Sequence, residues 1–265
     1  MRSLTAYAQT TNMFESKPLG YLEIYETYFA HKMNESIKLL ELGVAGGQSM
    51  KMWQDYFCNG LIVGIDLFPK FEPGPDDTRV RIFSGLQNDF EFLKQVSAEC
   101  APDGFDIIVD DCAHIGQITK ESFWYLFKNH LKPGGIYAIE DWGTGYWGGY
   151  HNNVCYPDGA RFDPREKQTF MHRLSNSLLK TAPVEWQEQG VIQKFLKRFQ
   201  YQRRFKGHDY GMVGFVKQLV DELGIGEITG PQGIYPSVRE NTAHRLSQFA
   251  YVLYSPGVVI VKKIG

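Results

Sequence analysis

Two pairs of acidic residues stand out because each pair ends a short apolar run. Asp110 and Asp111 end one run, and Glu140 and Asp141 end another. If these runs are neighbouring strands, their ends lie about 4.8 Å apart. Three or four carboxylates then meet and raise one another's pKa values. A hard divalent cation such as Mg²⁺ relieves that repulsion, so we expect Asp111, Glu140 and Asp141 to be metal ligands.

A histidine lies close to these acids in the sequence. His114 follows Asp111 by three residues, and an imidazole that titrates near neutral pH suits removal of a hydroxyl proton. A nearby metal would orient that hydroxyl and lower its pKa. We therefore expect His114 to be a catalytic base. The structural alternative is that the acids cap helices or pair with lysine. For Asp110, a structural or cofactor-side role is as consistent with the sequence as metal binding.

A glycine-rich segment follows the first apolar run and suits a bound cofactor. Glu41 ends that run, Gly43 and Gly46 follow, and Asp66 ends the next run. Glycines let the backbone turn sharply and approach a ligand, and an acid in the place of Asp66 can bind ribose hydroxyls. The G-x-x-G-G spacing suits the methionine end of S-adenosylmethionine better than a pyrophosphate. The alternative is a plain strand-to-helix turn.

Further polar residues after the third apolar run can also contribute to this cofactor site. Gln87 or Asn88 follows the third run, where it can hydrogen-bond the adenine edge, while Asn88 or Asp89 can instead cap the next helix. With Asp110 as a further candidate, the expected cofactor residues are Glu41, Gly43, Gly46, Asp66, Gln87 and Asp110.

The elements that must position these residues alternate between apolar runs and helical segments, which is typical of a parallel sheet flanked by helices. Residues 133–135 (PGG) are expected to stop one helix and to begin the strand 136–140. A short connection at 255–257 predicts an antiparallel C-terminal hairpin. Expected strands are 37–42, 61–66, 79–83, 105–110, 136–140, 249–254 and 258–261, and expected helices are 48–57, 89–97, 117–130 and 212–223. This order of elements predicts an α/β, Rossmann-like class I methyltransferase fold, with a mainly parallel seven-stranded sheet and an antiparallel C-terminal hairpin.

Length and composition are consistent with one domain. The 265 residues carry a formal charge of −2, which favours neither nucleic acid nor an anionic membrane as a partner. Scattered cysteines and the lack of a long apolar run predict a cytoplasmic protein with reduced thiols. Within the domain we expect a helical leader over 1–36 and an insertion over 143–208. The insertion combines aromatic residues and a basic run, which suit a substrate lid or an oligomer contact.

Several of these segments resemble the macrocin and mycinamicin sugar O-methyltransferases. The similar stretches are 39–49 (LLELGVAGGQS), 110–114 (DDCAH), 132–141 (KPGGIYAIED), 145–147 (GYW), and the leader 17–21 (KPLGY) with Tyr25 and Glu26. The resemblance implies that S-adenosylmethionine and Mg²⁺ are bound, that Asp111, Glu140 and Asp141 match the metal ligands, and that His114 matches the base. It also implies a homo-oligomer. Cys112 and Ala113 depart from the Gly-Ser expected there.

The leading hypothesis is a metal-assisted O-methyltransferase that acts on a hydroxyl of a glycosylated or aromatic small molecule. Within the same class, the enzyme can be metal-independent or take a catechol. From other classes come a non-catalytic subunit that binds S-adenosylmethionine and a nicotinamide-dependent oxidoreductase. The glycine spacing and the C-terminal hairpin disfavour the oxidoreductase.

Overall fold

A seven-stranded sheet organises the protein, whose computed structural model describes residues 3–11, 17–146, 211–226 and 245–265. The strand order is β3-β2-β1-β4-β5-β7-β6. β1 to β5 are parallel to one another, and β7 runs antiparallel to both β5 and β6. The strands are β1 (Lys38–Leu42), β2 (Leu61–Asp66), β3 (Val80–Ser84), β4 (Phe105–Asp110), β5 (Leu131–Glu140), β6 (Phe249–Tyr254) and β7 (Val258–Lys263). The predicted fold class is confirmed.

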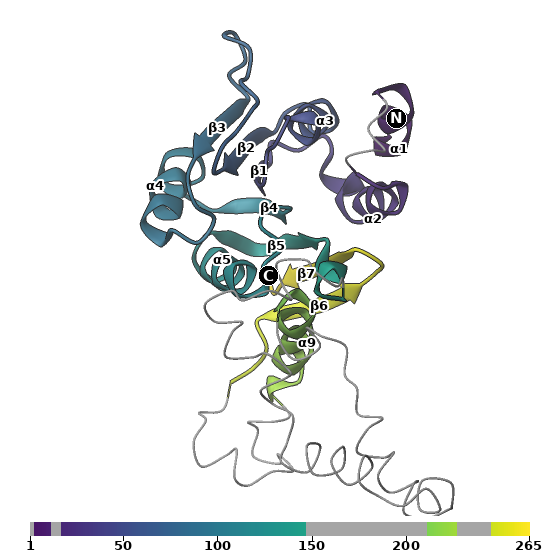
Figure 1. The fold of residues 1–265 in the computed structure, drawn as a ribbon, viewed down its shortest axis with the longest axis vertical. Helices are drawn as coiled ribbons and strands as arrows, with labels where there is room; N and C mark the ends of the chain where they lie inside the picture. Colours follow the sequence, from purple (N-terminus) through teal and green to yellow (C-terminus); the bar gives the residue numbers. More distant parts are fainter. Residues whose placement is uncertain (1–2, 12–16, 147–210, 227–244) are drawn as a thin grey trace, which may run out of the picture.

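Helices cover both faces of this sheet, so the core has two apolar layers (Figure 1). On one face lie α1 (Leu4–Thr11), α2 (Leu19–Phe29) and α3 (Gln48–Tyr56). On the other lie α4 (Phe90–Cys100), α5 (Gly116–Asn129) and α9 (Gly211–Leu223). Two short 3₁₀ helices, η2 (Ala30–Lys32) and η3 (Trp142–Tyr146), complete the described elements.

Alternation along the strands decides which side chains face which helices. Leu39 of β1 packs in the α1–α3 layer, whereas Leu40 and Leu42 pack in the α4–α9 layer. This period of two follows from the pleat, which sends successive side chains to opposite faces. The same rule places Glu41 on the α1–α3 side and Asp110 on the α4–α9 side, a difference that matters for the site.

The sequence prediction for residues 133–135 was wrong. Helix α5 ends at Asn129, before these residues, and β5 already begins at Leu131. Phe105 pairs with Leu131 and Ile107 pairs with Ile136, so the residues between Leu131 and Ile136 bulge out of the β4–β5 ladder. Proline is tolerated at such a bulge because it has no N–H to donate to the neighbouring strand.

The remaining sequence expectations concern the leader and the insertion. In the leader 1–36, the described residues form α1, α2 and η2. Of the proposed insertion 143–208, only residues 143–146 are described, and the aromatic residues beyond them and the basic run lie outside the described residues. Among the helices that the structure describes, none is both long and apolar enough to cross a membrane.

Candidate active site

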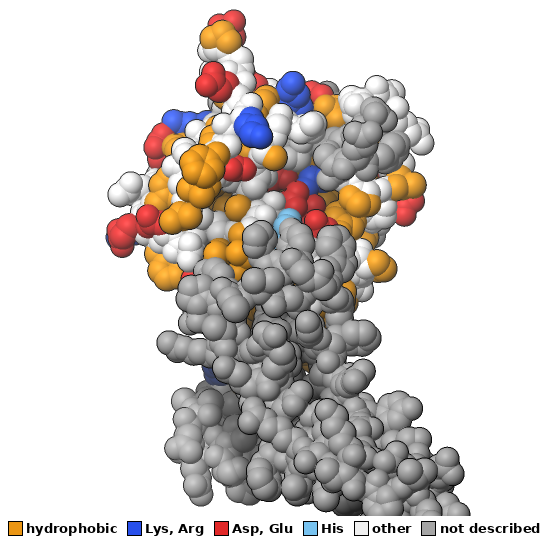
Figure 2. Space-filling model, viewed as in Figure 1, with side chains coloured by type: hydrophobic (Ala, Val, Ile, Leu, Met, Phe, Trp, Pro, Cys, Tyr) orange, Lys and Arg blue, Asp and Glu red, His pale blue; other side chains and the backbone are white. Residues whose placement is uncertain are grey.

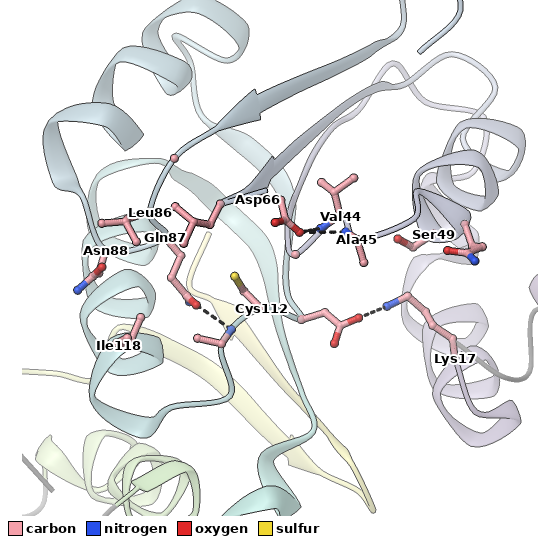
Figure 3. Close-up of a pocket in the computed structure, with 16 residues that line it drawn as sticks. Lys17, Val44, Ala45, Ser49, Asp66, Leu86, Gln87, Asn88, Cys112 and Ile118 are labelled. Atoms are coloured by element: carbon pink, nitrogen blue, oxygen red, sulfur yellow. Dashed lines mark hydrogen bonds and ion pairs between the residues drawn. The ribbon is translucent and has the colours of Figure 1, made fainter. Parts of the chain in front are cut away.

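A cleft of about 520 Å³ lies across the carboxyl ends of the parallel strands (Figure 3). Its walls come from the ends of four strands and the loops after them: residues 43–45 after β1, Asp66 at the end of β2 with Leu67 after it, residues 85–88 after β3, and residues 111–113 after β4. Lys17 of the leader also reaches it. This edge is where open α/β sheets bind their ligands, because the loops diverge there.

Asp66 is fixed in the cleft wall by the backbone around it. Its Oδ2 accepts hydrogen bonds of 2.9 Å from the N–H groups of Val44 and Ala45, and its Oδ1 accepts one of 2.8 Å from Phe68. Partial burial acts to raise the pKa of Asp66, but these backbone donors outweigh it and lower the pKa below its ordinary value. The carboxylate therefore stays charged and holds the glycine-rich loop against β2.

The first glycine of that loop is required by a close backbone contact. Gly43 has a φ of +92°, and a Cβ placed on it would lie 2.0 Å from the carbonyl oxygen of Asp111. No other residue lets the β1 and β4 loops approach so closely. Gly43 lines the cleft as expected, whereas Gly46 does not belong to the residues that line it.

Gln87 lines the cleft, but its amide is engaged with protein groups rather than left for an adenine edge. Its Nε2 donates to Asp110 and to Ser122, and its Oε1 accepts from the N–H of Ala113. Asp110 also accepts from Tyr137, and burial raises its pKa to about 6 against these hydrogen bonds. Gln87 and Asp110 thus brace the β4 loop from the α4–α9 side.

The residues after Gln87 divide between cleft and helix. Asn88 lines the cleft and donates to Glu121, while Asp89 caps α4 by accepting from the N–H of Phe92 at 3.1 Å. The capping alternative considered from the sequence therefore holds for Asp89.

The predicted base and two of the three predicted metal ligands meet at one point. His114 Nε2 lies 3.6 Å from Asp111 Oδ1 and 3.7 Å from Asp141 Oδ2. One atom of each residue lies within 4.8 Å of the others, which is close enough to share a cation. Figure 2 shows acidic side chains gathered beside a histidine on this face. We call Asp111, His114 and Asp141 the catalytic cluster.

Glu140, the third predicted metal ligand, lies on the side of Asp111 that faces α2, because the strand sends its side chain toward that helix. Its Oε1 accepts 2.7 Å and 2.6 Å hydrogen bonds from Lys17 and Tyr25. Lys17 Nζ also lies 2.9 Å from Asp111 Oδ2 and 3.3 Å from Glu41 Oε1. Atoms of Glu140, Glu41 and Asp111 also lie within 4.8 Å of one another, close enough to share a cation, so Asp111 belongs to both groups. We call Glu41, Glu140 and Lys17 the buried ionic group.

Burial controls the charges in this buried ionic group. Burial raises the pKa values of Glu41 and Glu140, while Lys17 opposes that rise. For Lys17, burial disfavours the charged form, but the carboxylates of Asp111, Glu140 and Glu41 outweigh it and raise its pKa. Glu41, which also accepts from Trp53 Nε1 at 3.2 Å, does not line the cleft. Asp110 does not line the cleft either, since both side chains point into the helix layers, and the expected contacts of Glu41 and Asp110 with a cofactor stay predictions.

Backbone strain is concentrated at the same edge of the sheet. Among the described residues, the non-glycine residues with positive φ are Ala45 (44°), His114 (49°) and Asp141 (52°). Such conformations cost of order 1–3 kcal/mol each and persist where the surrounding structure enforces them, often at functional sites. The strain supports a functional role for the loops after β1, β4 and β5.

A second cavity, of about 410 Å³, lies beside Asp141. Its lining comes from α2, from η3 with the residues before it, and from the β6–β7 turn, and includes Gly20, Tyr21, Gly143, Thr144 and Gly257. Tyr21 donates a 2.5 Å hydrogen bond to Asp141 Oδ1. Asp141 is therefore reached from this cavity, and Asp111 is reached from the first cleft.

Three polar residues of the leader were missed as site residues. Lys17, Tyr21 and Tyr25 all contact the predicted acids, although 94 to 123 residues separate the partners in sequence. The only signal was their position in the leader segments that resemble the sugar O-methyltransferases.

The strand order, the antiparallel β7 and the cleft at this edge define a class I methyltransferase fold. No protein-family model matches the chain. In sequence, the chain is related to the mycinamicin- and macrocin-type sugar O-methyltransferases, as its motifs indicated.

The matches cover part of each relative. The chain is 38% identical over 149 residues to the mycinamicin VI 2''-O-methyltransferase of Micromonospora griseorubida, covering 54% of this chain and 34% of that protein. It is 38% identical over 133 residues to the demethylmacrocin O-methyltransferase of Streptomyces fradiae, covering 48% of this chain and 32% of that protein. The match thus spans about a third of each curated relative.

A solved methyltransferase structure is similar to the chain over a longer stretch than these sequence matches. The methyltransferase MycE of the mycinamycin biosynthetic pathway, in complex with Mg, SAH and mycinamycin VI, aligns with a TM-score of 0.64 and 25% identity. The alignment covers 99% of this chain and 54% of that chain.

Proposed function

We propose that this chain is an S-adenosylmethionine-dependent, Mg²⁺-assisted O-methyltransferase that methylates a sugar hydroxyl of a glycosylated natural product. One observation carries the proposal: Asp111 lies both in the wall of the cleft and in the catalytic cluster. A methyl donor in the cleft and a hydroxyl at the cluster would therefore be neighbours. The names of the relatives, which describe sugar O-methyltransferases, support the choice of acceptor.

The donor set of the catalytic cluster fits a hard cation. Asp111 and Asp141 offer carboxylate oxygens, the ligands that Mg²⁺ prefers, within 4.8 Å of each other and of His114. These two carboxylates would hold the ion, which when bound orients a hydroxyl and lowers its pKa. The MycE complex, which contains Mg and SAH, supports the presence of a cation in such a site. Glu140, engaged by Lys17 and Tyr25, would support the site from the buried ionic group.

His114 is placed to accept the hydroxyl proton. Asp111 and Asp141 flank its Nε2 and would stabilise the imidazolium that forms. In the proposed reaction the acceptor oxygen bonds to the methyl carbon of the donor as the carbon–sulfur bond breaks, and the proton passes to His114. Holding both reactants in adjoining cavities supplies much of the rate. The sugar ring would lie in the cavity beside Asp141.

Calorimetric titration with S-adenosylhomocysteine, with and without Mg²⁺, tests the cofactor assignment. We expect binding by the wild type and loss of binding in Asp66→Ala, because that carboxylate holds the cleft wall. Asp76→Ala, which changes an exposed acid, is the matched control. A wild type that does not bind would overturn the proposal and return attention to nicotinamide cofactors.

Turnover of a panel of glycosylated macrolides and rhamnosylated polyketides tests the chemistry. His114→Ala should abolish methylation while leaving the affinity for S-adenosylhomocysteine near that of the wild type. Retention of most activity would show that His114 is not the base. A protein that binds the cofactor but methylates none of these acceptors would favour the non-catalytic reading.

A metal-independent methyltransferase is the second candidate, and one observation favours it. Lys17 already supplies a buried positive charge between Asp111 and Glu140. Dialysis against a chelator separates the two candidates. Lost turnover that Mg²⁺ restores supports the metal-assisted reaction, and unchanged turnover supports the metal-independent one.

The proposal also includes a cytoplasmic homo-oligomer, for which the support is the resemblance of the leader and site motifs to an often oligomeric family. Light scattering coupled to size-exclusion chromatography tests the assembly. A single species near 30.3 kDa, the mass of one chain, would contradict it.

A further inference from the structure

Each carboxylate of the catalytic cluster has its two oxygens in different surroundings. Asp111 Oδ2 accepts a 2.9 Å hydrogen bond from Lys17, while Oδ1 faces His114 at 3.6 Å. Asp141 Oδ1 accepts a 2.5 Å hydrogen bond from Tyr21, while Oδ2 faces His114 at 3.7 Å. One oxygen of each acid is thus held by the leader, and the other points into the cluster.

We propose that Lys17 and Tyr21 are positioning residues of the cation site. By holding the outer oxygens of Asp111 and Asp141, they fix the rotation of both carboxylates and leave the inner oxygens converging beside His114. Partners that orient ligating carboxylates in this way are commonly worth 10–100-fold in metal affinity. This inference rests on the proposed function for the presence of a cation, and it adds residues from a segment that contributes no ligand.

The leader is itself fixed by the opposite end of the described chain. Tyr21 is buried, and its hydroxyl fits against the β6–β7 turn only because residue 257 is glycine. A Cβ on Gly257 would lie 2.1 Å from the Tyr21 oxygen, and its φ of +83° also favours glycine. Pro18 begins the turn that leads into α2, so Lys17 and Tyr21 lie on one short, ordered segment.

Lys17 and Tyr21 differ in charge, so their effects on the orientation and on the electrostatics of the carboxylates can be separated. Lys17 carries a positive charge, so its loss changes both the orientation and the electrostatics of Asp111. Tyr21 is neutral, because burial and the hydrogen bond to Asp141 raise its pKa. Replacing Tyr21 with phenylalanine removes the hydroxyl and leaves the ring and the net charge unchanged. The tyrosine variant therefore tests orientation alone.

Binding of Mn²⁺, followed by the electron paramagnetic resonance signal of the free ion, measures the cation site without requiring an acceptor. We expect Tyr21→Phe to bind Mn²⁺ at least about 10-fold more weakly than the wild type, with an unchanged affinity for S-adenosylhomocysteine. Tyr28→Phe, on the same helix and in contact with Tyr251, is the matched control and should bind Mn²⁺ normally. Lys17→Arg keeps the charge but changes its shape, and should also weaken Mn²⁺ binding.

The outcomes separate this inference from the proposed function. Wild-type Mn²⁺ affinity in a folded Tyr21→Phe protein, checked by its metal-free melting temperature, would overturn the positioning role. A wild type that binds S-adenosylhomocysteine but not Mn²⁺ would overturn both the cation site and the positioning role, while leaving a metal-independent methyltransferase. If Tyr21→Phe unfolds, wild-type Mn²⁺ affinity in Lys17→Arg would overturn the role instead.

Discussion

Replacing Lys17 with methionine would leave the carboxylates of Glu41, Glu140 and Asp111 without the cation they share. The Lys17 and Glu41 side chains are at most 1% exposed and that of Glu140 is 2% exposed, so water cannot replace the ammonium. Removing one partner of a buried ion pair typically costs about 3–5 kcal/mol. We expect a loss of this size in the free energy of unfolding at pH 8, in the presence of a chelator.

The loss should shrink as the pH falls. Burial raises the pKa values of Glu41 and Glu140 above those of an unfolded chain, and loss of Lys17 raises them further. A group whose folded pKa is raised stabilises the fold at low pH, and that stability is lost as the pH rises toward the folded pKa. The deficit changes only in the pH range where the variant binds a proton that the wild type has lost, by about 1.4 kcal/mol per pH unit for each carboxylate. The deficit should therefore be smaller at pH 5 than at pH 8.

Urea unfolding of four proteins at both pH values measures this effect. The double variant Lys17→Met/Glu140→Gln should recover stability at pH 8, because an amide needs no counter-ion. Lys94→Met removes an ion pair whose lysine is 62% exposed and should change stability by less than about 1 kcal/mol. If Lys17→Met costs as little as Lys94→Met, or has the pH dependence of the wild type, the account of the buried ionic group is wrong.

Three further substitutions test separate parts of the structure. Gly20→Leu fills the cavity beside Asp141, from a position where a Cβ meets no atom within 4 Å. The variant should bind S-adenosylhomocysteine normally and methylate its acceptor at least about 10-fold more slowly. Unchanged turnover would place the acceptor elsewhere. Gly43→Ala should destabilise the fold by about 1–3 kcal/mol or more, because Gly43 has a positive φ and lies against the Asp111 carbonyl. A urea midpoint equal to that of the wild type would contradict this. Asp89→Ala should cost about 1 kcal/mol through loss of the α4 cap, without changing cofactor affinity; no loss in a thermal melt would argue against the cap.

The sheet was predictable because its signals are local. Apolar runs of five or six residues, each followed by a helix or turn signal, gave strand boundaries within about one residue for β1 to β4. β5 was the exception, because proline and two glycines resemble a helix stop whether they end a helix or form a bulge inside a strand. Only the pairing of Phe105 with Leu131 distinguishes the two cases.

The site was predictable to the extent that strand ends determine it. Asp66 and Asp111 reached the cleft because each ends a strand or follows one, and His114 joined Asp111 because three residues separate them. The protein partners of the acids were not predictable: Glu140 accepts from Tyr25 and Asp110 accepts from Tyr137, and neither hydrogen bond has a signal in the sequence near the acid. The residues that hold these acids come from distant segments, and no local pattern marks them.

The position of β7 in the sheet means that the sheet can be completed only late in the synthesis of the chain. β5 carries Glu140 and is made early, but among the described strands its outer edge is paired by β7 alone, which follows after residues 141–257 have been synthesised. At a typical translation rate that interval is on the order of ten seconds. During this interval the outer edge of β5 has no partner strand. Unpaired strand edges can pair with other molecules and aggregate. Soluble yield in the cell should therefore respond to translation speed and to chaperone supply more than the stability of the finished protein suggests.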